Sequence, residues 1–160
     1  MTNFISALTT VCFALATGIF LTLSYIEKPI WPLMKQPKHE QVSDENARLI
    51  HGELKRVIKL LPPTMMTIMG TGTILTVVQA WKRNFDLASM TTLVFLIIGL
   101  GYILTQLFGR IEAVEKTSSD GEIVTVRTGL GRLAAIHHVG LFTASGLCLL
   151  QLVLVFGISR

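Results

Sequence analysis

Charged side chains are scarce in this chain. Only 15% of its 160 residues are Asp, Glu, Lys or Arg, whereas 51% are hydrophobic. A soluble domain carries about 25% charged residues. The charges avoid four long apolar runs, and the mean hydropathy is +0.60. This deficit argues against an ordinary soluble domain and predicts a membrane protein.

Cysteine is nearly absent, with Cys12 and Cys148 as the only two. Both lie within apolar runs, and the sequence contains neither Cys-x-x-Cys nor Cys-x-x-Cys-His. The signatures of a zinc ribbon and of c-type haem attachment are therefore lacking. We expect both cysteines to be small packing residues.

A strongly basic face is also lacking, although the formal net charge is +4. The basic residues flank the apolar runs, so we expect them to meet the lipid bilayer and its anionic headgroups, and no nucleic acid. The first apolar run follows Met1-Thr-Asn, which has no basic side chain. We therefore expect that run to be a retained helix and not a cleaved signal peptide.

Four apolar runs are each long enough to cross a membrane. A hydrocarbon core of about 30 Å requires about 20 helical residues at about 1.5 Å each. The predicted spans are residues 4–26, 60–81, 87–108 and 133–159. The fold class is therefore all-α, a membrane-spanning four-helix bundle that forms one domain over residues 1–160.

An amphipathic helix is predicted over residues 44–61, before span two. Ser43 is suited to cap it, and Asp44 and Glu45 place acidic charge in its first turn. His51 lies within a stripe of apolar residues at helical spacing, namely Ala47, Ile50, Leu54, Val57, Ile58 and Leu61. Pro62-Pro63 then predicts one kinked helix or two helices joined by a bend.

The connection between spans three and four, residues 110–128, is polar. Ser118-Ser119-Asp120-Gly121 is a turn signal, and the residues from Glu122 to Val126 favour a strand. A short β-hairpin is therefore expected here.

Basic residues predict the orientation. Eleven lie on one side of the predicted spans, namely Lys28, Lys35, Lys38, Arg48, Lys55, Arg56, Lys59, Arg110, Lys116, Arg127 and Arg132. The other side has Lys82, Arg83 and Arg160. The positive-inside rule makes the first side cytoplasmic. We expect an integral protein of a bacterial inner (plasma) membrane with both termini outside the cytoplasm.

Two adjacent histidines, His137 and His138, lie one to two turns inside span four. Imidazoles at that depth cost free energy unless they find partners, so they indicate a functional site. His51 is expected at the same membrane level. We predict that these three share a cytoplasm-side pocket with Tyr102 and Gln106, polar residues on one face of span three. The acids expected at this level are Glu27, Glu53 and Glu112.

Several functions suit such a pocket. His137 or His138 could move a proton on a small apolar or aromatic ligand from the bilayer, with Tyr102 or Gln106 orienting an oxygen. Alternatively, His51 and one of the other two could be axial ligands of haem b in an electron-transfer protein. No metal site is predicted, because Glu-x-x-His and His-x-x-x-His are absent. The remaining alternative is a non-catalytic accessory or structural subunit, in a membrane complex or a homo-oligomer.

Two short stretches resemble the anthrone oxygenase-like family of small four-helix membrane proteins. The first runs from Gly18 to Pro29, where span one enters a proline-bearing exit. The second runs from His137 to Ser145 and resembles the family's last helix, which opens with a polar His or Asn motif. The four-span layout with a long first polar segment also agrees.

The resemblance implies oxidation or isomerisation of a lipid-soluble aromatic molecule. Named members oxygenate polycyclic aromatic anthrones and are thought to need no metal or flavin. Those members commonly have an arginine after the terminal motif, where this chain has Val139-Gly140. Only His137 and His138 therefore carry over as candidate catalytic residues.

Overall fold

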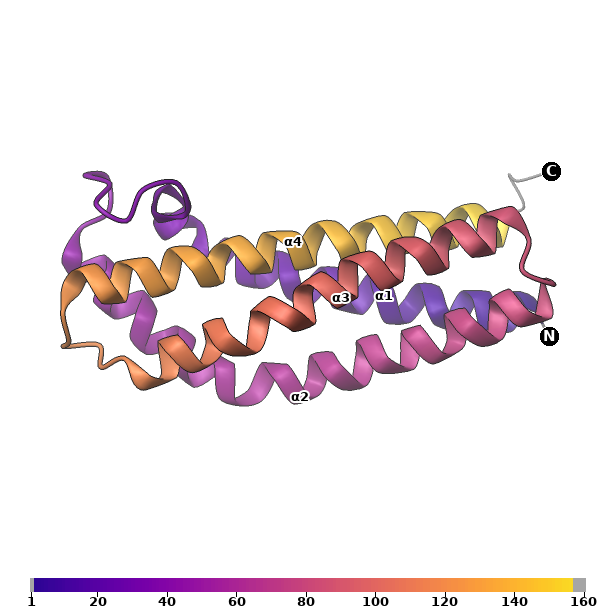
Figure 1. The fold of residues 1–160 in the computed structure, drawn as a ribbon, viewed down its shortest axis with the longest axis horizontal. Helices are drawn as coiled ribbons and strands as arrows, with labels where there is room; N and C mark the ends of the chain where they lie inside the picture. The colour runs from indigo at the N-terminus through magenta and orange to yellow at the C-terminus, as the bar shows by residue number, and fades with distance from the viewer. Residues whose placement is uncertain (1, 157–160) are drawn as a thin grey trace.

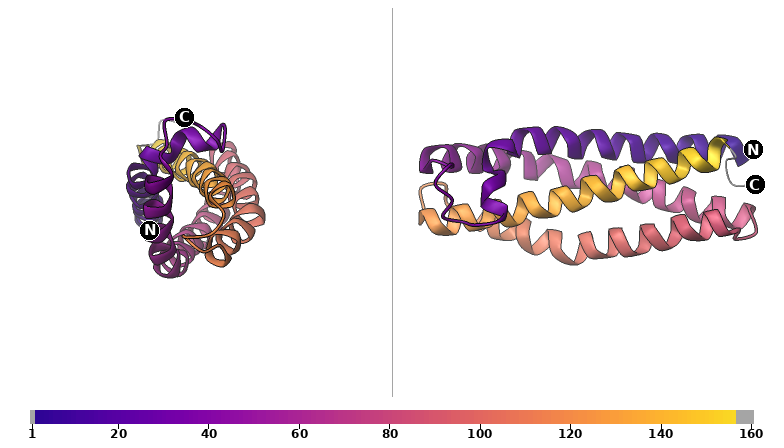
Figure 2. Two further views of the ribbon diagram at one scale, coloured as in Figure 1. Left: turned by 90° about the vertical axis from the view of Figure 1, so that its left-hand side faces the viewer. Right: turned by 90° about the horizontal axis from the view of Figure 1, so that it is seen from above.

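The computed structural model describes residues 2–156, and within them it has four α-helices, one 3-10 helix and no strand. The elements are α1 (Thr2–Glu27), η1 (Lys28–Met34), α2 (Asp44–Lys82), α3 (Leu87–Lys116) and α4 (Ile123–Phe156). The helices form an elongated bundle in which the start of α1 and the end of α4 lie at one end, with η1 toward the other (Figures 1 and 2). The predicted all-α four-helix bundle is confirmed.

The outer surface of the bundle is apolar. Each of the four α-helices is long and apolar enough to cross a membrane, and at most 33% of its most apolar 18-residue window is buried. Large apolar side chains such as Ile97, Phe142 and Leu149 are more than 60% exposed. Soluble monomers rarely expose apolar surface on this scale. The fold is therefore compatible with an integral membrane protein.

Two glycines of α4 allow close approach of other elements. A Cβ at Gly131 would collide with the backbone carbonyl of Leu33 in η1, and a Cβ at Gly140 would collide with the Phe20 ring of α1. Ile30 and Leu33 of η1 are consequently buried. These contacts hold the end of α1 and the whole of η1 against the middle of α4.

The predicted amphipathic helix forms the first part of α2. Ser43 caps it by accepting a hydrogen bond from the Asn46 backbone N–H at 3.2 Å. The predicted stripe turns inward, with Ala47, Ile50, His51, Leu54 and Ile58 all buried. The helix continues through Pro62 and Pro63 as a single helix, and its axis changes direction partway along (Figure 1).

The predicted β-hairpin is wrong. α4 begins at Ile123 and α3 continues to Lys116, so only residues 117–122 connect them. Val126 and Leu130 are fully buried in the core. Arg127 donates hydrogen bonds to the carbonyls of Pro37 at 2.7 Å and His39 at 2.6 Å. Such tertiary contacts outweigh the intrinsic strand preference of a short segment.

Candidate functional site

A buried carboxylate–imidazole pair joins α1 to α4. Oε1 of Glu27 lies 2.6 Å from Nδ1 of His137, and the Glu27 side chain is completely buried. Glu27 is the last residue of α1, and η1 follows it directly. Because η1 is packed on α4, the chain cannot carry this carboxylate outward to the headgroup layer. The fold thus holds an acid and a histidine together in the interior.

One oxygen of the Glu27 carboxylate has no hydrogen-bond partner within residues 2–156. Oε2 of Glu27 is buried and has no hydrogen-bond partner among the described residues. When Glu27 is ionised it can only accept, so Nδ1 of His137 donates the shared proton. Nε2 of a neutral His137 is then an acceptor, and this is the tautomer that a general base requires.

His138 differs from its neighbour, because both of its ring nitrogens have partners. Its Nδ1 donates to the carbonyl of Ala134 at 2.8 Å, and its Nε2 lies 3.3 Å from the hydroxyl of Ser24. The ring also meets the Trp31 ring edge-on, with 5.2 Å between centroids. These contacts favour a structural part for His138 and leave His137 as the stronger catalytic candidate.

An apolar cavity of about 50 Å³ lies against His137. A second cavity of about 150 Å³ shares Phe20, Pro62, Met65 and Leu107 with it. The residues that line the two come from α1, α2, α3 and α4, and His137 is the only ionisable one among them. The two cavities are therefore neighbours that share these four side chains, and the inner one is bounded by an imidazole.

The outer cavity reaches the bundle surface between α2 and α3. Met66 of α2 and Leu104 and Phe108 of α3 line it, and their side chains are 58%, 41% and 50% exposed. Methionine is flexible and fills irregular gaps, so Met65 and Met66 can move to admit a ligand. An apolar molecule dissolved in the bilayer would therefore meet this opening directly.

His51 is fully buried, but its contacts are with another part of the fold. Its Nδ1 lies 3.0 Å from the Ser119 hydroxyl. Arg48 donates to the Ser119 carbonyl, and Lys55 donates to the Thr117 carbonyl at 2.9 Å. These contacts fasten the connection between α3 and α4. His51 does not line the cavity that His137 lines, so the predicted pocket of three histidines is not formed.

This arrangement does not fit a haem held between His51 and His137. Ser119 and Glu27 contact only the Nδ1 atoms of the two imidazoles, so the misfit lies in the space between the histidines and not in these contacts. His51 does not line the cavity beside His137, so that cavity does not extend between the two imidazoles. Among residues 2–156, no three His, Cys, Asp or Glu side chains gather in a way that could hold a metal ion.

Tyr102 and Gln106 do not join the histidines. Tyr102 is 50% exposed, and Gln106 accepts a hydrogen bond from Arg110 at 3.2 Å in the groove between α3 and α4. The opposite face of α3, with Ile103 and Leu107, lines the apolar cavities. The predicted polar face does turn toward α4, but α3 and α4 diverge along this part of the bundle (Figure 1).

Glu27 is the residue that sequence reasoning did not assign to the site. It stands beside Lys28 where span one ends, a place at which an acid ordinarily faces water or headgroups. The available signal was its position at the membrane level of His137. The structure adds the turn of η1, which directs the carboxylate inward.

Comparison of the chain with protein-family models, with curated proteins and with solved structures finds no significant match.

Proposed function

We propose that this chain is an integral membrane protein that transfers a proton on a small apolar or aromatic molecule taken from the bilayer. The observation that supports this most is the buried Glu27–His137 pair at the inner end of an apolar cavity. An acid that holds Nδ1–H of a histidine orients the ring so that Nε2 can act as a base. The anthrone oxygenase-like family remains the suggested relationship.

Each residue has a defined part in this proposal. Nε2 of His137 removes a proton from an acidified C–H group of the ligand. Glu27 holds Nδ1–H and stabilises the imidazolium that forms, as the acid does in other acid–histidine pairs. Phe20, Met65 and Leu107 exclude water from the site. His138 and Ser24 hold the adjoining turns of α4 and α1.

The fate of the resulting carbanion distinguishes two reactions. If His137 returns the proton to another carbon, the molecule is isomerised and no other reactant is needed. If the family resemblance extends to chemistry, dioxygen is the co-reactant. A methylene group and O₂ then give a carbonyl group and one water molecule, so the ligand is oxidised and dioxygen reduced.

The experiment follows proton exchange on anthrone, a tricyclic compound with an acidified methylene group. Protein in detergent micelles is incubated with anthrone in D₂O without oxygen, and exchange at the methylene is followed by mass spectrometry. We expect His137→Gln to lose about 10²–10⁴-fold of the protein-dependent rate. Tyr102→Phe, at a half-exposed residue that lines neither apolar cavity, is the matched control. Equal rates for wild type and His137→Gln would refute the proposal.

A second candidate is a non-catalytic subunit of a membrane complex. It is favoured by the mutual pairing of polar groups, since Ser24, Glu27 and His137 all find partners across α1 and α4. On this alternative the pair stabilises packing alone. Anthrone would then neither exchange faster with the protein than in buffer nor bind to it.

A further inference from the structure

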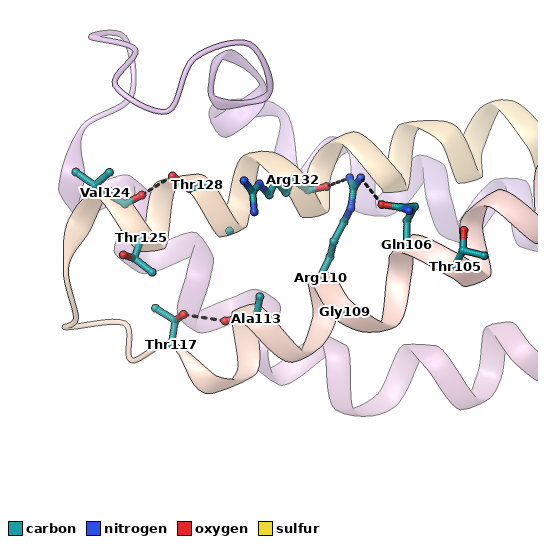
Figure 3. A pocket seen from close by; sticks show the side chains of 11 residues that line it. Thr105, Gln106, Gly109, Arg110, Ala113, Thr117, Val124, Thr125, Thr128 and Arg132 are labelled. Atoms are coloured by element: carbon teal, nitrogen blue, oxygen red, sulfur yellow. Dashed lines mark hydrogen bonds between the residues drawn. The ribbon is translucent and has the colours of Figure 1, made fainter.

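A polar groove lies on the other side of α3 from the apolar cavities. It has a volume of about 570 Å³ and runs between the C-terminal half of α3 and the N-terminal part of α4 (Figure 3). Gly109 and Gly129 line the groove, and a Cβ at Gly109 would meet nothing within 4 Å. The space is therefore a real opening produced by the divergence of the two helices.

Two arginines from the facing helices give the groove its charge. Arg110 of α3 reaches across to donate to the Arg132 carbonyl at 2.6 Å, and it also donates to Gln106 (Figure 3). A guanidinium has five N–H donors, so Arg110 keeps several for a ligand. The guanidinium of Arg132 is exposed and contacts no acceptor within residues 2–156.

No acidic side chain lines the groove. Of the acids nearby in the sequence, Glu112 pairs with Lys116 at 2.5 Å and Glu122 accepts from the Thr125 hydroxyl at 3.0 Å, while Glu115 and Asp120 do not line the groove. Two cations that line one groove without an acid among its lining residues repel, and an anion relieves that repulsion. Guanidinium groups bind phosphate oxygens through paired, charge-assisted hydrogen bonds.

The groove lies at a definite membrane level. Predicted span three ends at residue 108 and span four begins at residue 133, so Arg110 and Arg132 stand at the boundary of the hydrocarbon layer. Exposed apolar side chains continue from the groove along both helices, including Ile98 of α3 and Phe142 of α4. A ligand with an anionic head and apolar tails matches both the arginines and the exposed apolar side chains. Free phosphate matches the arginines alone.

We propose that Arg110 and Arg132 bind the phosphate of an anionic glycerophospholipid in the groove between α3 and α4, with its acyl chains along the exposed apolar faces of these helices. The orientation expected from the basic residues places this site in the cytoplasmic leaflet, where anionic lipids attract basic side chains. The site is separate from the Glu27–His137 pair.

Native mass spectrometry of protein released from mixed phosphatidylglycerol and phosphatidylcholine micelles tests the proposal. The wild type should retain one phosphatidylglycerol in preference to phosphatidylcholine. Arg132→Gln should reduce that retention about five- to tenfold, and Arg110→Gln with Arg132→Gln should abolish it. Arg56→Gln, which removes an exposed arginine of α2 paired with Glu53, is the matched control and should retain the lipid.

Three other outcomes would overturn the assignment of a lipid site to this groove. Equal retention by wild type and Arg132→Gln would show that the groove is not the site. Equal loss in Arg56→Gln would show that overall charge, and not this groove, attracts the lipid. Displacement of the lipid by millimolar inorganic phosphate would make the ligand a free anion. The Arg132 side chain makes no hydrogen bond or ion pair within residues 2–156, so the helix content of Arg132→Gln should match that of the wild type.

Discussion

Glu27 Oε1 lies 2.6 Å from His137 Nδ1, across the interface between the last turn of α1 and the middle of α4. Both side chains are buried, at 0% and 9% side-chain exposure. A pair of this kind is costly to break, because the partner that remains is buried without a hydrogen bond. The pair therefore contributes to folding as well as to the proposed chemistry.

Removal of one member of the pair should destabilise the protein. Glu27→Leu leaves Nδ1 of His137 unpaired and should cost about 1–3 kcal/mol of unfolding free energy. The double variant Glu27→Leu/His137→Leu should recover part of that loss, since no polar group is then left alone. Reversible unfolding in mixed micelles measures both changes. Glu53→Leu, an exposed acid on α2, is the control, and an equal loss there would contradict a specific pair.

Gly131 is expected to be intolerant of a side chain. Gly131→Ala puts a Cβ against the Leu33 carbonyl, so η1 must move away from α4. We expect a loss of about 1–3 kcal/mol, as for other overpacked sites, and a matching loss of anthrone exchange because Glu27 precedes η1. Gly101→Ala has nothing within 4 Å of its new Cβ and should be neutral or slightly stabilising. Similar stability of the two variants would contradict this packing.

Arg127 should be essential for the order of residues 35–43. It is 8% exposed and donates to the carbonyls of Pro37 and His39 and, at 2.5 Å, to Oδ1 of Asp44. Arg127→Met keeps the apolar stem but removes these bonds, and should cost about 2–4 kcal/mol. Limited proteolysis should then cut near Lys38 faster than in the wild type. An unchanged cleavage rate would show that Arg127 does not hold the loop.

Asp86 should give the turn between α2 and α3 an acid-dependent stability. Burial alone would raise its pKa, but hydrogen bonds from Arg83 and Ser89 lower the pKa to about 2. Its ordinary value of 3.8 is higher, so the stabilisation is complete above pH 4 and is lost as the pH falls toward 2. The side chain is 38% exposed, so solvent screening limits the effect to less than about 1 kcal/mol.

The variant Asp86→Asn checks this dependence. It keeps an acceptor for the Ser89 backbone N–H, which Asp86 Oδ1 binds at 2.9 Å, but removes the ion pair with Arg83. Unfolding free energies measured from pH 1 to pH 6 should differ between wild type and variant above pH 4, and the difference should disappear as the pH falls through 2. A constant difference across that range would assign the effect to something other than the charge.

Much of this fold follows from local patterns in the sequence. Uncharged runs predict the four long helices, and the stripe around Leu54 predicts the buried face of the first part of α2. The prediction of a hairpin was wrong because the residues from Glu122 to Val126 prefer a strand only in isolation. Burial of Val126 and the hydrogen bonds of Arg127 stabilise a helix there. Those contacts come from residues about 90 positions away in the chain.

The site could be predicted only in part. His137 was identifiable because an imidazole within an apolar run needs a partner. Its partner, Glu27, could not be predicted, because the carboxylate is directed inward by η1. The packing of η1 against Gly131 joins residues far apart in the sequence. Tyr102 and Gln106 share the stripe of Gly99, where α3 does touch Thr143 of α4. Helical periodicity cannot show that the two helices diverge further along the bundle.

The most direct test of the central claim is ¹⁵N NMR of histidine-labelled protein in micelles, with and without anthrone. The account predicts that His137 carries its proton on Nδ1 and that its unprotonated Nε2 resonance shifts when anthrone binds, while the resonances of His51 do not. Glu27→Gln should alter the His137 signals alone. A His137 protonated on Nε2, or an Nε2 resonance that anthrone leaves unchanged, would contradict the account.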